Sequence, residues 1–563
     1  MSEKSSGNSF LQTLVKLTPD QVLYLTAIVI FFLKFQLRTR LLGWWDSAQF
    51  ALALERYNIV EHRPHPPGYP LYILWGKIAT YFTHDPNMSF ILFGLVLSVI
   101  AAVLIKKFMD RLTGDTSVGW IAFALYSFAP LTFFHELKAL TYVISAFFSI
   151  LVAFEALRIL NSDEPKAWRI ALALGIMGMI RPYESILLLP LAIWVVWRLG
   201  MRSFLAASGI YIGLQIVWLI PVALMSGGFK AYFSELASEG GKHQRNIISL
   251  MDKPLGKTVK NLKSIYYYLR QSFPGWAFFA IVPVVEKILK PGEKSRNVVF
   301  FVLWLMPALI LYSINYVNYA AIPIFISPAI AILIALGIKK SIQLFGSFKF
   351  KLGNFNAQPR NLLRLIAVII SLHLLVIFFS IDILFTNESN RKYDENAFNY
   401  DKLLASDSYS YMFKSSVLNL SEELGGSDKV VVLSDLNYRV LMYYLPAHVV
   451  LWTRYLSQKS AGASGVTKIA LNRNDEEITL PSIDYDSKKY WVYELKKGEK
   501  AAVFTDEMLP AVVDKSHIRP LPGMKGAQAF IIDLENAWGI FFRYGEFGVL
   551  TKETAKKMQL DAK

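Results

Sequence analysis

The chain has 563 residues, of which 54% are hydrophobic and only 18% are charged, whereas soluble domains usually carry about 25% charged residues. The formal net charge of +16 does not indicate nucleic-acid binding, because the basic residues stand in short loops between apolar blocks, a pattern that membrane topology explains. The sequence contains no cysteine, which excludes disulfides, thiolate metal sites and cysteine nucleophiles.

Apolar blocks of membrane length fill the chain from Val22 to Phe385 and predict an α-helical polytopic membrane protein. About eleven spans are expected, since roughly 20 apolar residues cross a bilayer. They lie near Val22–Phe35, Phe90–Ile105, Val118–Phe134, Ala139–Ala156, Ile170–Ile180, Ser185–Trp197, Phe204–Met225, Trp276–Leu289, Val298–Tyr312, Ala320–Ile338 and Leu365–Phe385. No small-residue cleavage site follows the first block, so we expect a retained anchor. The fifth and sixth blocks are short and are separated by Arg181-Pro182, so they form either two spans or one kinked element.

Lysine and arginine residues are concentrated in every second loop, a bias that marks the cytoplasmic side. The basic loops hold Lys106, Lys107 and Arg111; Arg158, Lys166 and Arg169; Arg198 and Arg202; Lys287, Lys290, Lys294 and Arg296; and Lys339, Lys340, Lys349, Lys351, Arg360 and Arg364. The N-terminus is therefore predicted to be cytoplasmic. An odd number of spans then places the C-terminal domain on the extracytoplasmic side of a cell membrane or, in a eukaryote, in the lumen of the endoplasmic reticulum.

Two domains are predicted on this basis. Residues 1–386 form a membrane domain with long outer loops at about 38–89 and 226–274, and residues 387–563 form a soluble extracytoplasmic domain. The second domain alternates strand-like runs with helical stretches, so we expect an α/β fold. The strand-like runs are Lys429–Leu433, Tyr490–Tyr493, Ala501–Phe504 and Ala529–Ile532.

The first outer loop carries the most informative segment, residues 43–75, which reads GWWDSAQFALALERYNIVEHRPHPPGYPLYILW. Its aromatic rings suit a membrane interface. HPPGYP cannot be a helix interior, because its prolines restrict the backbone while Gly68 permits a tight turn. Asp46 stands just before a helical stretch, Ala48 to Arg56. An acidic group at a membrane surface is either a helix N-cap or a functional group, and the segment alone leaves both open.

The Asp-Ser-x-x-Phe pattern followed by His-Pro-Pro-Gly-Tyr-Pro-Leu-Tyr resembles the GT-C superfamily of integral membrane glycosyltransferases, in its protein O-mannosyltransferase-like branch. Asp46, Ser47 and Phe50 match the Asp-Ser-Gly-Glu-Phe type motif of that branch, whereas Ala48 and Gln49 depart from it. The resemblance implies a GT-C-like fold and inverting transfer of mannose or another hexose from a polyprenyl-phosphate donor, with Asp46 as the base. Because Gln49 replaces a carboxylate, it can only hydrogen-bond. No metal or other cofactor is implied.

Further candidate residues stand at the outer ends of other spans. Glu136 is a candidate second catalytic carboxylate, expected to face the same outer cavity as Asp46, or else a helix cap or interfacial charge. Arg181 runs against the positive-inside rule, so it is either a bidentate ligand of a lipid phosphate or the salt-bridge partner of Glu184. The candidates for substrate binding are Gln49, His65, Tyr69, Tyr142, Arg181, His243 and Arg245.

Two sets of polar residues allow a structural explanation as well as a functional one. His243 and Arg245 lie in the second long loop beside two glycines, and they either hold the carrier phosphate or belong to a solvated loop. The tyrosines near the ninth and tenth spans, Tyr312, Tyr316 and Tyr319, either stack on a sugar or anchor helix ends at the interface. The histidines of the first outer loop match no metal-binding spacing, so no metal site is expected.

The sequence therefore predicts a glycosyltransferase whose acceptor is a protein, another glycan or a lipid headgroup. The rival class is a transporter or lipid flippase, which would place charges or broken helices near the membrane midplane and show inverted repeats. The polar residues instead cluster at the outer ends of the spans. A membrane scaffold whose outer domain binds partners is a third class. The place where charges converge distinguishes the first two.

The topology is testable with reporter fusions. Fusions placed near Gly346 and Gly426 are expected to report opposite sides of the membrane, because one span separates them and only the first lies in a basic loop. Matched pairs of a cytoplasmic reporter and an extracytoplasmic reporter at each position make the measurement. The same side for both fusions would contradict the predicted topology.

Overall fold

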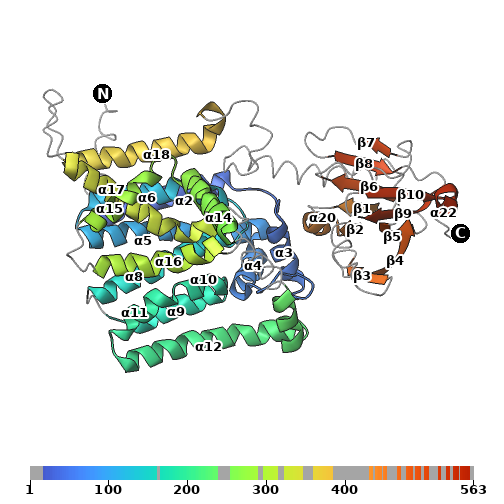
Figure 1. Cartoon of the computed structure of the whole chain (residues 1–563), viewed down its shortest axis with the longest axis horizontal. Helices are drawn as coiled ribbons and strands as arrows, with labels where there is room; N and C mark the ends of the chain where they lie inside the picture. Colours follow the sequence, from blue (N-terminus) through green and yellow to red (C-terminus); the bar gives the residue numbers. More distant parts are fainter. Residues whose placement is uncertain are drawn as a thin grey trace, which may run out of the picture. The chain divides into compact units, whose positions relative to one another are not determined.

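The structure is a computed structural model of the chain (Figure 1), which divides into two compact units. The described residues are 17–161, 165–238, 254–289, 296–314, 322–345, 359–384, 430–434, 438–446, 448–452, 466–470, 477–485, 488–495, 500–505, 518–520, 528–532, 537–543 and 546–557. The first unit comprises Met1–Thr39 and Arg56–Leu403, and the second comprises Arg40–Glu55 and Leu404–Lys563. The second unit thus includes part of the first outer loop predicted from the sequence.

The first unit is a bundle of helices (Figure 1). Its elements are α2 (Pro19–Leu37), α4 (Pro70–Thr83), α5 (Pro86–Thr113), α6 (Thr116–Phe128), α7 (Pro130–Glu136), α8 (Tyr142–Leu160), α9 (Ala167–Gly178), α10 (Pro182–Leu187), α11 (Leu189–Trp197), α12 (Met201–Met225), α14 (Pro254–Ser272), η1 (Ala277–Ala280), α15 (Ile281–Leu289), α16 (Arg296–Ile314), η2 (Ile322–Ile326), α17 (Ser327–Phe345) and α18 (Pro359–Leu384). Among the described residues, seven helices are long and apolar enough to cross a membrane, or eight if α6 and α7, bent by 57°, form one span. A polytopic helical membrane protein is confirmed.

The described residues thus hold fewer candidate spans than the eleven predicted, and the count of eleven stays a prediction. Three of the predicted blocks fold as shorter helices: Ile170–Ile180 falls in α9, Ser185–Trp197 in α10 and α11, and Trp276–Leu289 in η1 and α15. Prolines stand in the first turns of α10 and α11. A first turn tolerates the missing N–H, but the proline ring prevents one helix from continuing through that point.

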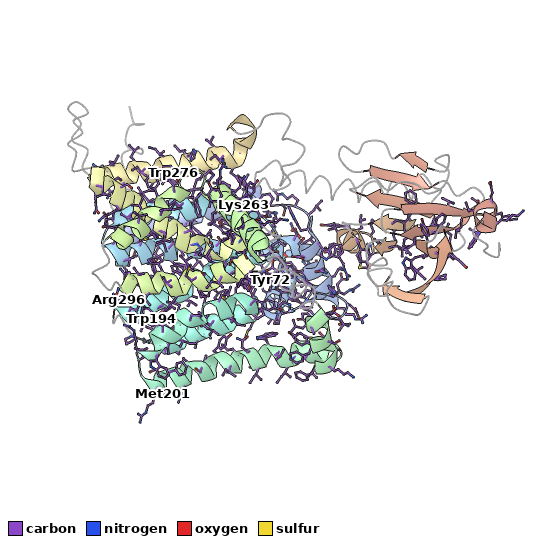
Figure 2. The ribbon with its side chains drawn as sticks, viewed as in Figure 1. Tyr72, Trp194, Met201, Lys263, Trp276 and Arg296 are labelled. Atoms are coloured by element: carbon purple, nitrogen blue, oxygen red, sulfur yellow. The ribbon has the colours of Figure 1, made fainter. Side chains whose placement is uncertain are left out.

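Basic residues gather at one end of the first unit. Lys107 of α5 donates to the Tyr24 hydroxyl at 2.7 Å, so the end of α5 lies beside the start of α2. Arg296 at the start of α16 donates to the carbonyl oxygen of Leu160 at the end of α8, at 2.7 Å. Figure 2 shows Arg296 at this end and Tyr72 toward the opposite one. The arrangement agrees with the alternating loops, and the side of the membrane that each end faces stays a prediction.

The second unit combines short helices with two five-stranded sheets built from the described strands. Its elements are α3 (Trp45–Glu55), β1 (Val430–Ser434), α20 (Tyr438–Tyr444), β2 (Val449–Trp452), β3 (Val466–Ala470), β4 (Glu477–Tyr485), β5 (Lys488–Glu494), β6 (Lys500–Thr505), β7 (Ile518–Pro520), β8 (Gln528–Ile532), β9 (Ala537–Arg543), β10 (Glu546–Thr551) and α22 (Lys552–Lys557). The first sheet has the order β2-β1-β6-β8-β7, with β1 parallel to β2 and β6. The second is antiparallel, in the order β10-β9-β5-β4-β3.

A shared hydrophobic core joins these two sheets. Val431 and Leu433 of β1 pack in one cluster with Trp491 and Tyr493 of β5 and with Phe542 of β9. The four predicted strand-like runs correspond to β1, β5, β6 and β8, so they are confirmed. Alternate residues of β1 and β5 face the common core because side chains in a strand alternate between faces.

The tightest approach between helices supplies a test of the bundle. Gly337 of α17 lies so close to η1 that an added Cβ would overlap the carbonyl oxygen of Phe279. Gly337→Ala should therefore destabilise the protein by about 1–3 kcal/mol, as overpacking does. Gly213→Ala in α12 is the matched control, because no atom lies within 4 Å of its added Cβ, and alanine favours a helix by about 1 kcal/mol over glycine. Thermal unfolding in detergent should lower the Tm of the first variant only, and equal Tm values would contradict the packing.

Candidate active site

The HPPGYP segment, residues 65–70, forms a rigid turn that two tyrosines hold from outside. The Tyr57 hydroxyl donates to the carbonyl oxygen of Gly68 at 2.8 Å, and the Tyr232 hydroxyl donates to that of Pro67 at 3.3 Å. Gly68 has φ +114°, and an added Cβ there would overlap the Tyr57 hydroxyl, so only glycine fits. The turn ends where Pro70 starts α4.

Both of these tyrosines remain protonated donors. Burial raises the pKa of Tyr57 far above its ordinary value, and the neighbouring Tyr232 adds to the effect. Burial, with a contribution from Tyr183, also raises the pKa of Tyr232 to about 12. A phenol with so high a pKa keeps its proton at physiological pH. The hydrogen bonds to the turn are therefore independent of pH.

Four residues surround the guanidinium of Arg181, and we call the group the Arg181 cluster: Arg181, Glu184, Thr141, Tyr142 and Tyr69. Arg181 Nε donates to Glu184 Oε1 at 2.6 Å and its Nη1 donates to Thr141 Oγ1 at 3.0 Å. The guanidinium also lies 4.9 Å from the ring centroid of Tyr142, within the range of a cation–π contact. Tyr69 of the turn interacts with it electrostatically. The salt bridge to Glu184, one of the two alternatives from the sequence, is therefore present.

The cluster brings together four residues that the sequence singles out for substrate binding. Tyr142 and Arg181 are in contact, Tyr69 lies within electrostatic range of Arg181, and His65 Nε2 lies 2.7 Å from the Tyr69 hydroxyl. They come from the HPPGYP turn, the start of α8 and the α9–α10 junction. The fold thus brings four of the predicted substrate-binding residues together at the end of the first unit opposite the basic loops.

Tyr312 of α16 belongs to the same neighbourhood. It is 6% exposed and interacts electrostatically with Glu184 and Arg181. Its hydroxyl has no hydrogen-bond partner within the part of the chain that the structure describes. A buried hydroxyl normally has a partner, so this group is suited to meet a polar ligand. Two other tyrosines of the predicted set, Tyr316 and Tyr319, lie outside the described residues.

Glu136 does not face an open cavity in the described structure. Its carboxylate forms a buried ion pair with Lys34 of α2, with side chains 1% and 2% exposed. Ser98 of α5 donates to the same carboxylate, and the Tyr126 hydroxyl lies 3.1 Å from Ser98 Oγ. The sequence gives no sign of the pairing, because Lys34 appears there as a lone cation in an apolar span. A catalytic role for Glu136 stays a prediction.

Asp46 and Gln49 lie on helix α3 of the second unit. Asp46 is the second residue of the helix and is partly exposed, whereas Gln49 is buried. At the start of α3, Ser47 Oγ donates to the Trp44 carbonyl oxygen at 2.7 Å and accepts the Trp44 N–H at 3.2 Å. The structure therefore places Asp46 within the first turn, two positions beyond the N-cap position, which Trp44 occupies.

The remaining candidates concern the second long loop and metals. His243 and Arg245 lie outside the described residues. Among the residues that the structure does describe, no group of three or more His, Asp or Glu side chains is arranged to hold a metal ion. His62 Nε2 instead lies 3.2 Å from Glu235 Oε1.

Comparison with known protein families finds one match, over part of the chain. Residues 64–225 of the 563 match the family model of dolichyl-phosphate-mannose-protein mannosyltransferases. This segment includes the HPPGYP turn, Glu136, Tyr142 and Arg181. A comparison with curated protein sequences gives no match. The family match confirms the enzyme class that the sequence predicts, a glycosyltransferase.

The fold is similar to that of ArnT from Cupriavidus metallidurans. The crystal structure of ArnT bound to undecaprenyl phosphate matches with a TM-score of 0.50 and 11% sequence identity, over 90% of this chain and 97% of that chain. The crystal structure of ArnT in the apo state matches with a TM-score of 0.46 and 12% identity, over 76% of this chain and 84% of that chain. The first likeness confirms the overall fold.

Proposed function

We propose that this protein transfers a sugar from a polyprenyl-phosphate donor to an acceptor hydroxyl on the extracytoplasmic side of the membrane. The observation that carries the proposal is the Arg181 cluster, a partly buried guanidinium close to Tyr142 and Tyr69, beside a rigid turn. It lies within the segment that matches the mannosyltransferase family. The structural likeness to ArnT, whose crystal structure holds undecaprenyl phosphate, adds support for a lipid-phosphate donor.

The proposed reaction is a single displacement with inversion at the sugar C1. The acceptor oxygen forms a bond to C1 while the bond from C1 to the phosphate oxygen breaks, and the electron pair leaves with the phosphate. Asp46 takes the proton of the acceptor hydroxyl as general base. The departing phosphate monoester gains negative charge, and a guanidinium stabilises such charge through paired N–H donors.

Arg181 suits this role because its charge is already held in place. Glu184 and Thr141 fix the guanidinium plane through Nε and Nη1, so little side-chain entropy is lost when a ligand binds. A phosphate carries more charge than the Glu184 carboxylate and would share the guanidinium with it. His65, Tyr69 and Tyr142 lie around the guanidinium and would contact the sugar or the phosphate. Gln49 would bind substrate from α3, and His243 and Arg245 would hold the carrier phosphate from the second long loop.

A transporter or flippase fits the described charges less well. Such proteins place reachable charges or broken helices near the midplane. The intramembrane charges Lys34 and Glu136 neutralise each other, with side chains 2% and 1% exposed. They are closed inside the bundle, whereas the Arg181 cluster lies at a bundle end. This contrast favours a transferase.

The activity can be tested in proteoliposomes. Undecaprenyl phosphate carrying radiolabelled mannose, and a panel of other undecaprenyl-phosphate hexoses, serve as donors with a membrane extract as the source of acceptors. A transferase releases undecaprenyl phosphate and moves label to a new product, whereas a flippase moves intact donor between leaflets. Movement of donor without cleavage of its sugar–phosphate bond would refute the proposal.

The phosphate role of Arg181 predicts a defect in donor binding. Arg181→Ala should raise the KM for donor at least about tenfold, since a charge-assisted hydrogen bond contributes about 1.5–3 kcal/mol. Arg181→Lys should recover only part of this loss, because lysine lacks the fork of donors. Arg198→Ala, which removes an arginine stacked on Trp194 instead, is the control. Unchanged donor kinetics in Arg181→Ala would reject the assignment.

The catalytic role of Asp46 predicts a defect in turnover. Asp46→Asn keeps the shape of the side chain and removes its basicity, so kcat should fall by about 10²–10⁴-fold. Asp20→Asn is a matched control, because Asp20 is likewise the second residue of a helix, α2, and loses the same favourable charge near a helix N-terminus. Near-normal turnover by folded Asp46→Asn protein would show that Asp46 only stabilises α3.

A further inference from the structure

Helix α3, which carries Asp46, packs against helix α20 of the second unit. The backbone N–H of Leu42 donates to the Tyr444 hydroxyl at 2.6 Å. The rings of Trp45 and Tyr438 lie with centroids 6.1 Å apart at 43°, within the range of favourable aromatic pairs. One contact precedes α3 and the other is made by its first residue. Tyr438 and Tyr444 of α20 therefore contact the chain at the N-terminal end of α3, where Asp46 lies.

Helix α20 is itself firmly attached to the sheet. It connects the neighbouring parallel strands β1 and β2, and its residues Tyr438 to Met442 are buried. Close by, His448 Nδ1 accepts the N–H of Val430 at 3.1 Å, which ties the entry to β2 to the start of β1. Tyr438 and Tyr444 thus belong to a helix that is packed in the core of its unit, and a precise site needs such well-packed supporting residues.

Thr39, which follows α2, is held by hydrogen bonds within the first unit. The Thr39 N–H and hydroxyl both donate to the carbonyl oxygen of Leu137, each at 3.0 Å. Asn87 Nδ2 donates to the Thr39 carbonyl oxygen at 2.8 Å.

We propose that the sheet domain positions the catalytic base: Tyr444 and Tyr438 of α20 hold α3 so that Asp46 meets the acceptor hydroxyl. The proposal rests on the proposed function, because it assumes that Asp46 acts as the base. It gives the C-terminal domain a part in turnover that its sequence does not indicate. Tyr444 and Tyr438 are positioning residues, since they act on the reaction only through α3.

The first test removes one oxygen atom. Tyr444→Phe keeps the ring and deletes the acceptor of the Leu42 N–H, so kcat should fall about tenfold or more while the donor KM stays unchanged, as expected when a base is displaced. Tyr490→Phe deletes the same atom from a buried tyrosine of β5 in a separate core cluster and should leave kcat unchanged. Undecaprenyl phosphate carrying radiolabelled mannose is the donor. A normal kcat in Tyr444→Phe would overturn the proposal.

Two further measurements separate positioning from general stability. In an Asp46→Asn background, Tyr444→Phe should have no additional effect, because the interaction acts through Asp46. Additive losses would overturn the proposal. Hydrogen exchange of the amides over residues 42–55 should rise in Tyr444→Phe, and unchanged exchange would also overturn it.

The outcome also separates the inference from the proposed function. Loss of turnover in Asp46→Asn together with normal turnover in Tyr444→Phe would overturn the inference alone. Normal turnover in Asp46→Asn would overturn the base assignment and the inference with it. Hydrogen exchange needs no substrate, so it reports on the grip of α20 whatever the donor proves to be.

Discussion

The ion pair between Lys34 and Glu136 is the interaction on which the packing of four bundle helices depends. It joins α2 to α7, and Ser98 and Tyr126 extend it to α5 and α6. Ser98 lies 11 residues along α5 from Asn87, so the pair is buried about 16 Å below the start of that helix. Removing one partner of such a pair leaves an uncompensated charge and costs about 3–5 kcal/mol. The pair therefore fixes the helices relative to one another.

The candidate site is built on the turn that follows this pair. Directly after Glu136, the Leu137 carbonyl oxygen receives Thr39, which ends the first segment of the bundle unit. Four residues further on, Thr141 accepts a hydrogen bond from Arg181, and Tyr142 lies against its guanidinium. One short connection between α7 and α8 thus contacts both Thr39 and Arg181. Glu136 ends α7 next to this connection, and its ion pair with Lys34 holds that end of α7 against α2.

Local patterns allowed part of this arrangement to be predicted. The prolines and glycine of HPPGYP predict a rigid turn, and alternating apolar runs predict β1, β5, β6 and β8. The charge of Arg181, anomalous for its position, pointed to the site without showing that Thr141 and Glu184 hold it. Other contacts join residues far apart in sequence, such as Leu42 with Tyr444, and no local periodicity reports them. Apolar content likewise does not show that Pro182 and Pro190 stand in the first turns of two separate short helices, α10 and α11.

The place of Lys34 in the sequence has a consequence for how the protein enters the membrane. Glu136 follows Lys34 by 102 residues, so α2 is synthesised long before its counter-charge. Lys34 lies in the last turn of α2, where a lysine costs less than the about 2.5–3.5 kcal/mol of a helix centre, and α2 has the lowest mean hydropathy, 1.5, of the seven long candidate spans in the described residues. Until α7 arrives, the long side chain must reach toward the interface to stay solvated. The first of the described helices therefore forms its ion pair only after α7 has been synthesised, so part of the packing of α2 is completed late in the assembly of the bundle.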